Sequence, residues 1–334
     1  MKDHFRRTID YLRISVTDRC NLRCIYCMPA DGLIPIEHKE ILSFEEIVRI
    51  VKISVNHGVT KIRITGGEPL VRRNVIYLIR LLNSIEGIKD LSLTTNGILL
   101  ERYADDLVDA GLKRVNISLD SLRPERFREI TRGGDINRVL NGIKSAEKAG
   151  LTPIKINMVP IRGINDDEIE DFARMTIKHP YQIRFIEFMP FGTQGMWKPE
   201  KFISSEGIRY IVEKFGKLTP VVQKKSGPAR YFKFDGADGV IGFISPISNH
   251  FCSECNRLRL TADGKLRPCL FSETEIDLKP ALRSNASDEE IDRLIKLSID
   301  VKPKGHNITI QNAELRTLIS SKQNSMRPMS KIGG

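Results

Sequence analysis

The sequence predicts an α/β protein whose core is a partial (β/α)6 barrel of the TIM type, followed by a smaller C-terminal extension. Two observations predict this fold. From Tyr11 to about Met189, short β-branched runs alternate with amphipathic stretches of helical spacing, and this alternation forms six strand-helix units. Six units are too few for a closed eight-stranded barrel. The chain has 334 residues and 40% hydrophobic content, enough for one large domain or for a domain with an appendage.

The elements follow from local patterns. Two stretches carry clear helix signals: residues 43–56 begin with a capping box of Ser43 and Glu46, and residues 137–149 end at Gly150. The β-branched runs predict strands at residues 11–16, 61–65, 90–95, 114–119, 153–159 and 182–188.

The regular alternation stops beyond Gly192, and residues 220–246 are rich in Gly, Pro and Val with strand character. We therefore divide the chain into a barrel core (1–190), a C-terminal region (191–325) and a tail (326–334). Residues 325–334 are polar and end in Gly-Gly, which by default predicts a frayed end.

The net charge of +11 predicts attraction to polyanions such as nucleotides or nucleic acid, although a charged soluble surface explains it equally well. The basic residues are spread along the chain, and the 7% aromatic content forms no basic-aromatic stripe, so we expect no nucleic-acid partner. The sequence lacks an apolar run of about eighteen residues, and its first ten residues lack the apolar stretch of a secretory signal. We expect a cytoplasmic protein with no membrane partner.

Three cysteines, Cys20, Cys24 and Cys27, follow the first predicted strand with C-x3-C-x2-C spacing. In barrel-like folds the loops after strands carry the chemistry. Three thiolates suit a cubane iron–sulfur cluster whose fourth iron stays open. A structural zinc would want a fourth ligand, and the nearest histidine is His38. Inert core cysteines or a redox dithiol are the other interpretations.

A second triplet, Cys252, Cys255 and Cys269, has C-x2-C-x13-C spacing. It again leaves one metal position open for a cluster. His250 precedes it by two residues and could complete a zinc shell, so the spacing alone leaves both metals open.

Polar residues also follow the other predicted strands. The second strand ends in Gly66-Gly67-Glu68-Pro69, where glycines let the backbone approach a ligand and the Glu68 carboxylate could meet an ammonium group. An ordinary strand-to-helix turn is the alternative. The ends of the later strands carry Thr94, Thr95, Asn96, Ser118, Asp120, Lys155, Asn157, Arg184, Glu187 and Met189. Each alone suits a helix cap or a solvated strand end, but together they would line one mouth of the barrel.

The first triplet and the GGEP turn resemble those of the radical S-adenosylmethionine superfamily. Both triplets and the tail together resemble the GTP 3′,8-cyclase family, which begins molybdenum cofactor biosynthesis, over essentially the whole chain. The stretches that carry this resemblance are LRISVTDRCNLRCIYCMP, RITGGEPLVR, LTTNG, VNISLDSL, IEFMPFG, CNRLRLTADGKLRPCLF and the terminal IGG.

The resemblance implies two [4Fe–4S] clusters, one on each triplet, with S-adenosylmethionine on the first and the guanine of GTP on the second. It implies that Gly333 and Gly334 reach into the site. The implied cofactor contacts are Tyr26, Gly67, Ser118 and Met189, to which we add Glu68. The implied GTP contacts are Arg13, Arg63, Thr94, Lys155, Arg257, Leu258 and Arg259, to which we add Arg184. Arginines and lysines at a barrel mouth also suit a triphosphate without the comparison.

The implied reaction starts when one electron cleaves S-adenosylmethionine into methionine and a 5′-deoxyadenosyl radical, which removes the 3′ hydrogen of GTP. The resulting ribose carbon radical attacks C8 of the guanine, and reduction then yields 3′,8-cyclo-7,8-dihydroguanosine 5′-triphosphate. The implied partners are an electron donor such as flavodoxin or ferredoxin, the downstream cyclic pyranopterin monophosphate synthase, and a second copy in a homodimer. The rival interpretations are another radical enzyme with an auxiliary cluster, such as a peptide-modifying one, and a zinc protein that binds nucleic acid.

Overall fold

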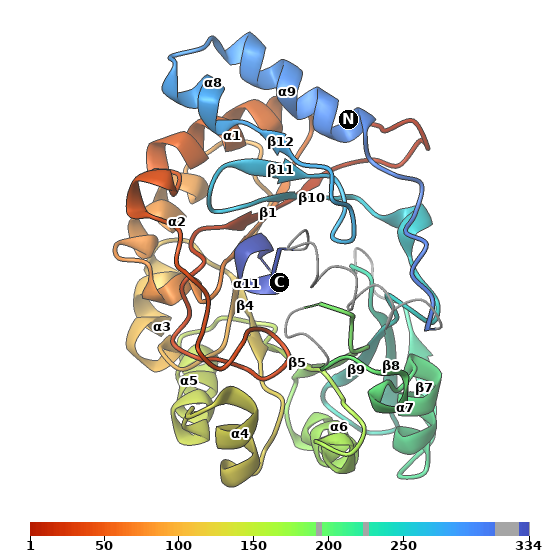
Figure 1. Cartoon of the computed structure of the whole chain (residues 1–334). Coiled ribbons are helices and arrows are strands. Elements are labelled where there is room, and N and C mark those ends of the chain that lie inside the picture. The colour runs from red at the N-terminus through yellow and green to blue at the C-terminus, as the bar shows by residue number, and fades with distance from the viewer. Residues whose placement is uncertain (192–195, 223–226, 311–326, 334) are drawn as a thin grey trace.

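The computed structural model describes residues 1–191, 196–222, 227–310 and 327–333. Its centre is a row of six parallel strands that neighbour one another in chain order (Figure 1). These strands are β1 (Tyr11–Ser15), β2 (Lys61–Thr65), β3 (Asp90–Thr95), β4 (Arg114–Ser118), β5 (Lys155–Met158) and β6 (Gln182–Ile186). The six predicted strands and the partial barrel are confirmed.

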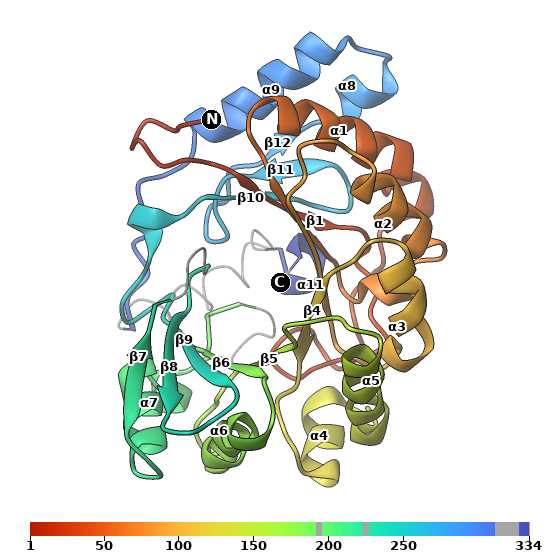
Figure 2. The same ribbon diagram turned by 180° about the vertical axis from the view of Figure 1, so that it is seen from behind.

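Helices form an outer layer around these strands, as the two opposite views show (Figures 1 and 2). The predicted capping box is present, since Ser43 Oγ accepts from the Glu46 N–H and the Glu46 carboxylate accepts from the Ser43 N–H. Gly150 has φ +87° beyond the end of α5, a conformation in which glycine ends helices. The helices are α1 (Phe44–Asn56), α2 (Val75–Asn83), α3 (Leu100–Asp109), α4 (Pro124–Thr131), α5 (Ile136–Lys148) and α6 (Ile169–Lys178).

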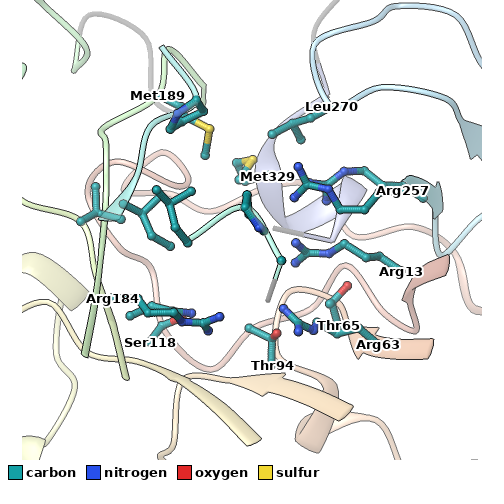
Figure 3. A pocket seen from close by; sticks show the side chains of 18 of the residues that line it. Arg13, Arg63, Thr65, Thr94, Ser118, Arg184, Met189, Arg257, Leu270 and Met329 are labelled. Atoms are coloured by element: carbon teal, nitrogen blue, oxygen red, sulfur yellow. The ribbon is translucent and has the colours of Figure 1, made fainter. Parts of the chain in front are cut away.

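The first strand shows how the sheet separates the core from the barrel interior. Leu12 and Ile14 are at most 1% exposed and belong to the main hydrophobic core. Arg13 between them points to the inside of the barrel (Figure 3). Because successive side chains of a strand point to opposite faces, the apolar set packs under the helices and the polar set faces inward. β2 repeats this pattern with Ile62 and Arg63.

The chain beyond β6 adds strands to both edges of the same sheet. β9 (Val240–Ile244) pairs parallel with β6, and β10 (Arg257–Leu260) pairs parallel with β1. Six strands alone would leave unpaired backbone groups along two edges, and these additions cover them. The predicted extension therefore shares one sheet with the barrel. The outermost strands are β7 (Leu218–Val221), β8 (Arg230–Phe234), β11 (Lys265–Arg267) and β12 (Ile276–Asp277), all paired antiparallel.

Three more helices cover this region: α7 (Ser205–Glu213), α8 (Lys279–Arg283) and α9 (Asp288–Asp300). α7 packs on β6 and β9, whereas α9 packs on α1 and β11. Several predicted strands are too long by one to three residues. β5 stops at Met158 and β6 at Ile186, because the chain turns there into the loops that face the barrel interior.

The tail does not fray where the structure describes it. A short helix, α11 (Met329–Ile332), lies in the middle of the barrel (Figure 1). Ser330 is 3% exposed and Ile332 is 1% exposed, so the tail is buried. Ile332 packs in a small hydrophobic cluster with Phe188 and Phe271. The default expectation of a frayed end is thus wrong for residues 327–333.

Candidate active site

One cavity of about 670 Å³ fills the interior of the barrel. Both cysteine triplets face it, although the two triplets are far apart in the sequence. Figure 3 shows Arg13, Arg63 and Arg257 entering the cavity from one side and Arg184 and Ser118 from another. Most predicted site residues line it: Arg13, Cys20, Cys24, Tyr26, Cys27, Arg63, Gly67, Thr94, Ser118, Lys155, Arg184, Met189, Cys252, Cys255, Arg257, Arg259 and Cys269.

The first triplet lies in the loop after β1, and its three cysteines are free and partly buried. A turn brings them together, since the Cys27 N–H donates to the Cys24 carbonyl at 2.9 Å. Two donors approach the Cys20 sulfur: the Leu22 N–H at 3.4 Å and Asn96 Nδ2 at 3.7 Å. Such donors stabilise sulfur that carries negative charge.

The thiols of this triplet hold their protons tightly. Burial raises the pKa of Cys20 to about 11 and that of Cys27 to about 12. Burial, followed by repulsion from Cys27, also raises the pKa of Cys24 well above its usual value. Because the thiolate is the metal ligand, a cationic centre bound here would relieve both effects at once.

A buried tyrosine-carboxylate pair adjoins the first triplet. Tyr26 Oη donates to Asp120 Oδ2 at 2.5 Å, and the Val159 N–H donates to Asp120 Oδ1 at 2.9 Å. Burial raises the pKa of Asp120 to about 6. The pair fixes the Tyr26 ring at the cavity wall, edge-on to Phe188 at a centroid distance of 6.4 Å.

The GGEP turn after β2 packs against the segment just before Cys20. A Cβ on Gly67 would lie 2.4 Å from the Arg19 carbonyl oxygen, and one on Gly66 would lie 2.7 Å from that of Thr17. Only glycine permits this approach. The Gly67 N–H also donates to the Thr17 carbonyl at 2.7 Å.

Glu68 has a different place from the one predicted. It is fully buried and is not among the residues that line the cavity. Its carboxylate accepts from the Leu70 N–H at 3.0 Å, Thr95 Oγ1 at 2.7 Å and the Asn96 N–H at 2.6 Å. Glu68 therefore ties the end of β2 to the end of β3, and its oxygens do not reach toward an ammonium group. Burial raises its pKa to about 7.

A row of guanidinium groups crosses three neighbouring strands. Arg259 of β10 lies in register with Arg13 of β1, which lies in register with Arg63 of β2. Burial, together with Arg259, Arg63 and Arg257, lowers the pKa of Arg13 well below its usual value. Burial lowers the pKa of Arg259 to about 9, and Arg257 adds to this. Gathering these charges is unfavourable until a polyanion binds among them.

Strands β3, β5 and β6 carry further polar and basic groups that line the cavity. Burial lowers the pKa of Lys155 to about 7 and that of Arg184 to about 10. Arg184 Nη2 donates to Asn116 Oδ1 at 2.7 Å, which orients the guanidinium. Thr94 Oγ1 is buried and has no hydrogen-bond partner within the described ranges, so it is available to a ligand. Within those ranges Lys155 and Arg184 form no salt bridge with a carboxylate.

The second triplet lies among cations. Burial opposes ionisation of Cys255, but Arg257 and Lys302 outweigh it and lower the pKa of Cys255 to about 6. Burial raises the pKa of Cys252. Arg7, which is 7% exposed, donates to the Cys252 carbonyl at 2.8 Å. An ion pair of 2.6 Å with Asp3 holds Arg7 in place.

The tail touches both sides of the cavity. Arg259 Nη1 donates to the Gly333 carbonyl at 2.6 Å, and the Ser330 backbone interacts with Cys27. Gly333 has φ +71°, and a Cβ there would lie 2.2 Å from Thr65 Oγ1. Both observations require glycine at this position. Gly334, predicted to act with Gly333, lies outside the described residues.

One further prediction differs from the structure, and the prediction did not include several residues at the site, among them Lys61, Arg7 and Lys302. Leu258 is 2% exposed and packs in the core, because it alternates with the inward-facing Arg257 and Arg259 on β10. Lys61 also lines the cavity, because it lies two residues before Arg63 on β2 and so on the same face of the strand. This spacing in the sequence was a signal for Lys61. Arg7 and Lys302 give no such signal, since they lie outside the regular elements.

The donor set fits iron–sulfur chemistry. Each triplet offers three free, partly buried thiols that face the cavity. Three thiolates per site suit a [4Fe–4S] cluster with one open iron. Within the described ranges, no group of three or more Cys, His, Asp and Glu side chains is arranged to hold a single metal ion.

The partial barrel, the three cysteines after its first strand and the GGEP turn after its second define the class of radical S-adenosylmethionine enzymes. Residues 14–176 match the model of the Radical SAM superfamily, and residues 181–308 match that of Molybdenum Cofactor Synthesis C. The chain belongs to the GTP 3′,8-cyclase family, as its full-length relatives show.

The chain is 57% identical over 336 residues to the GTP 3′,8-cyclase of Thermodesulfovibrio yellowstonii, with 100% of both chains covered. It is 52% identical over 334 residues to that of Alkaliphilus oremlandii, again with 100% of both covered. The Moorella thermoacetica GTP 3′,8-cyclase is 48% identical, also with 100% of both covered.

Solved structures agree on the fold. Streptococcus suis SuiB bound to S-adenosylmethionine has a TM-score of 0.59 at 16% identity, with 84% of this chain and 66% of that chain covered. SuiB bound to its precursor peptide SuiA has a TM-score of 0.60 at 15% identity, with 89% and 66% covered. At these identities the likeness concerns the barrel fold alone.

Proposed function

We propose that this protein converts GTP to 3′,8-cyclo-7,8-dihydroguanosine 5′-triphosphate, the first step of molybdenum cofactor biosynthesis. Membership of the GTP 3′,8-cyclase family supports the reaction. The observation that carries the proposal is the single cavity of about 670 Å³ that both triplets and the guanidinium row face. A volume of this size lies in the usual range of small-molecule and cofactor sites.

Cys20, Cys24 and Cys27 would hold the first [4Fe–4S] cluster, which together with bound S-adenosylmethionine supplies the radical that removes the ribose hydrogen. Tyr26, Gly67, Ser118 and Met189 are the proposed contacts of S-adenosylmethionine, and all four line the cavity. At Gly67 the backbone packs closely against the backbone of Arg19. Because Gly67 has no side chain and lines the cavity, its main chain can contact the polar end of the cofactor. Glu68 holds this turn in place from behind.

Arg13, Arg63 and Arg259 would bind the triphosphate, because guanidinium groups hold phosphate oxygens with paired hydrogen bonds. Lys155 and Arg184 face the same space from β5 and β6, and Thr94 faces it from β3, the strand beside that of Arg63. Binding a polyanion would return the lowered pKa values of Arg13 and Lys155 toward their usual range. Arg257 belongs to the same set, and Leu258 contributes packing beneath it.

Cys252, Cys255 and Cys269 would hold a second [4Fe–4S] cluster whose open iron takes the guanine. The three thiols line the cavity on the side of the guanidinium row. In this division residues 1–190 supply the radical site, residues 191–325 the second cluster, and residues 326–334 a tail between them. The Arg259–Gly333 hydrogen bond supports a role of the tail in orienting that guanidinium.

Flavodoxin or ferredoxin is the electron donor that we propose, with cyclic pyranopterin monophosphate synthase as the next enzyme and a homodimer as the assembly. A cytoplasmic location suits six free cysteines, since a reducing compartment keeps thiols reduced. In the described part of the chain, no helix has the length and apolar character needed to cross a membrane.

The test is anaerobic reconstitution with iron and sulfide, followed by reaction with S-adenosylmethionine, a reductant and GTP. We expect mass spectrometry to find 5′-deoxyadenosine and the cyclic nucleotide in equal amounts. Consumption of S-adenosylmethionine while GTP survives would make this a different radical enzyme. Stoichiometric zinc without iron in anaerobically purified protein would replace both clusters with the zinc interpretation.

A further inference from the structure

Lys302 is a buried lysine beside the second triplet. It follows α9 and is 3% exposed. An ammonium group is costly to bury unless its three protons find acceptors. Lys302 is not among the residues that line the cavity, so it approaches the triplet from the protein side and not from the side where substrate would bind.

The Lys302 ammonium has three partners, one for each proton. Lys302 Nζ donates to the Arg257 carbonyl at 2.8 Å and to the Pro268 carbonyl at 2.5 Å. Its third contact is Cys255 Sγ at 3.6 Å. The two carbonyls belong to the segments that carry the triplet, since Arg257 lies two residues after Cys255 and Pro268 immediately precedes Cys269.

The segment after Lys302 packs against Cys252, the remaining cysteine of the triplet. A Cβ on Gly305 would lie 3.4 Å from Cys252 Cβ, which shows close packing there. Arg7 Nη1 joins the two segments, because it donates both to the Cys252 carbonyl at 2.8 Å and to the Lys304 carbonyl at 3.0 Å. The stretch that begins at Lys302 therefore contacts Cys255, Cys252 and the residue before Cys269, with Lys302 itself outside the cavity.

We propose that Lys302 is a positioning residue for the second cluster: it holds the Cys255 and Cys269 segments at a fixed separation and directs a positive charge at the Cys255 sulfur. This rests on the proposed second cluster. Two consequences follow. The lysine favours assembly of the cluster, and its charge stabilises the more negative, reduced form of the cluster relative to the oxidised form.

The test uses holoenzyme reconstituted anaerobically as wild type, Lys302→Met and Lys304→Met. Lys304 is an exposed lysine two residues away, so K304M makes the same change of net charge without touching the triplet. Iron and sulfide content give cluster occupancy, and a redox titration followed by electron paramagnetic resonance gives the reduced fraction of each cluster. Formation of 5′-deoxyadenosine from S-adenosylmethionine reports the first cluster separately.

For K302M we expect one of two results. Either the second cluster alone is lost, or it stays bound and becomes harder to reduce. In the second case its reduced-to-oxidised ratio at the wild-type midpoint potential should fall by about tenfold or more, equivalent to about 59 mV for one electron. The first cluster and K304M should match wild type. K302M with full occupancy and an unchanged second potential would overturn the proposal.

Should K302M fail to fold, Lys302→Gln decides, because its amide still donates to the carbonyls but carries no charge. A folded K302Q with a wild-type second potential would overturn the role of the charge. A wild-type protein that binds only one cluster would overturn the second cluster itself, and the wild-type sample alone reveals that result.

Discussion

The two cysteine triplets face one cavity, but their surroundings have opposite charge. Carboxylates adjoin the first triplet: burial is the main cause that raises the pKa of Cys24 and of Cys20, and Asp120 adds to it at Cys24, after Cys27, and Glu68 at Cys20. Cations adjoin the second, where Arg257 and Lys302 lower the pKa of Cys255 to about 6. Identical ligands are thus placed in two different electrostatic environments.

If both triplets hold clusters as proposed, this difference shows how one fold can support two tasks with the same ligand chemistry. Nearby negative charge disfavours adding an electron to a cluster, and nearby positive charge favours it. The first site is therefore suited to the stronger reductant, which cleavage of S-adenosylmethionine needs. The second site, beside the guanidinium row, is suited to an anionic nucleotide.

Removing a ligand from the first triplet should have the largest effect. Cys24→Ala leaves two thiols, too few for a cluster with three protein ligands. We expect 5′-deoxyadenosine and cyclic nucleotide both to disappear, as measured by mass spectrometry after anaerobic reaction. Iron content should fall by one cluster and not two. Loss of both clusters would indicate a general folding defect.

The matching change at the second triplet should separate the two activities. Cys269→Ala should abolish the cyclic nucleotide while 5′-deoxyadenosine still forms, because the radical site is built from other residues. The same mass-spectrometric assay measures both products. If C269A stops 5′-deoxyadenosine as completely as C24A does, the two sites are not independent and the comparison fails.

Changing the guanidinium row should weaken substrate binding without touching either triplet. Arg63→Met removes a charged donor, and a hydrogen bond to a charged group contributes about 1.5–3 kcal/mol. We expect the KM for GTP to rise about 10- to 100-fold, with GTP-independent 5′-deoxyadenosine formation unchanged. The exposed Arg73→Met is the matched control. An unchanged KM would remove Arg63 from the triphosphate site.

The contact of the tail with both sides of the cavity predicts a smaller loss. Gly333→Ala places a Cβ against Thr65 at a φ of +71°, which costs an L-residue about 1–2 kcal/mol. We expect kcat to fall about tenfold while both clusters stay occupied. Gly150→Ala has φ +87° but open space around the added atom, so it controls for backbone strain alone. Full activity of G333A would return the tail to a passive role.

Buried Glu68, beside the first triplet, should make stability depend on pH. Of the changes considered, its replacement should affect turnover least. The pKa of Glu68 is raised from 4.5 to about 7, so the folded protein binds a proton that the unfolded chain releases between these values. The contribution of Glu68 to stability is full below pH 4.5 and is lost as pH rises through about 7, by about 3 kcal/mol.

Urea unfolding of the iron-free protein at pH 4.5 and pH 7 measures this contribution. Relative to Glu68→Gln, wild type should have a larger free energy of unfolding at pH 4.5 than at pH 7. The exposed Glu101→Gln should show no such shift relative to wild type. A pH-independent difference for E68Q would mean that its three donors keep Glu68 ionised.

The sequence predicted the six central strands well because their signals are local, namely alternation within each run and caps at each end. It did not predict that β9 and β10 pair with β6 and β1, since a strand's partner depends on contacts that are distant in sequence. Strand ends were also misplaced, because the apolar pattern continues into the loops that face the cavity.

Within the site, spacing marked both cysteine triplets as candidate metal sites, and only the family resemblance predicted that they share one cavity, which both line. Lys302 is one of 53 lysines and arginines, and only the packing after α9 makes it buried. Glu68 was predicted to meet an ammonium group, but it points instead to β3 and the residue after it, which supply its partners Thr95 and Asn96. Local pattern thus identifies chemical groups, whereas tertiary packing decides where they point.

During synthesis β1 leaves the ribosome long before its partner strand β10. Asn256 Nδ2, just before β10, donates a hydrogen bond to Asp10 Oδ1, just before β1, and the two residues are 246 positions apart in the sequence. At 5–20 residues per second, synthesis of that interval takes on the order of 10–50 s. During this time β1 has a bare edge next to three thiols, and bare edges attract other strands. Stalled translation after β6 would therefore leave a nascent chain prone both to aggregation and to oxidation at its first triplet.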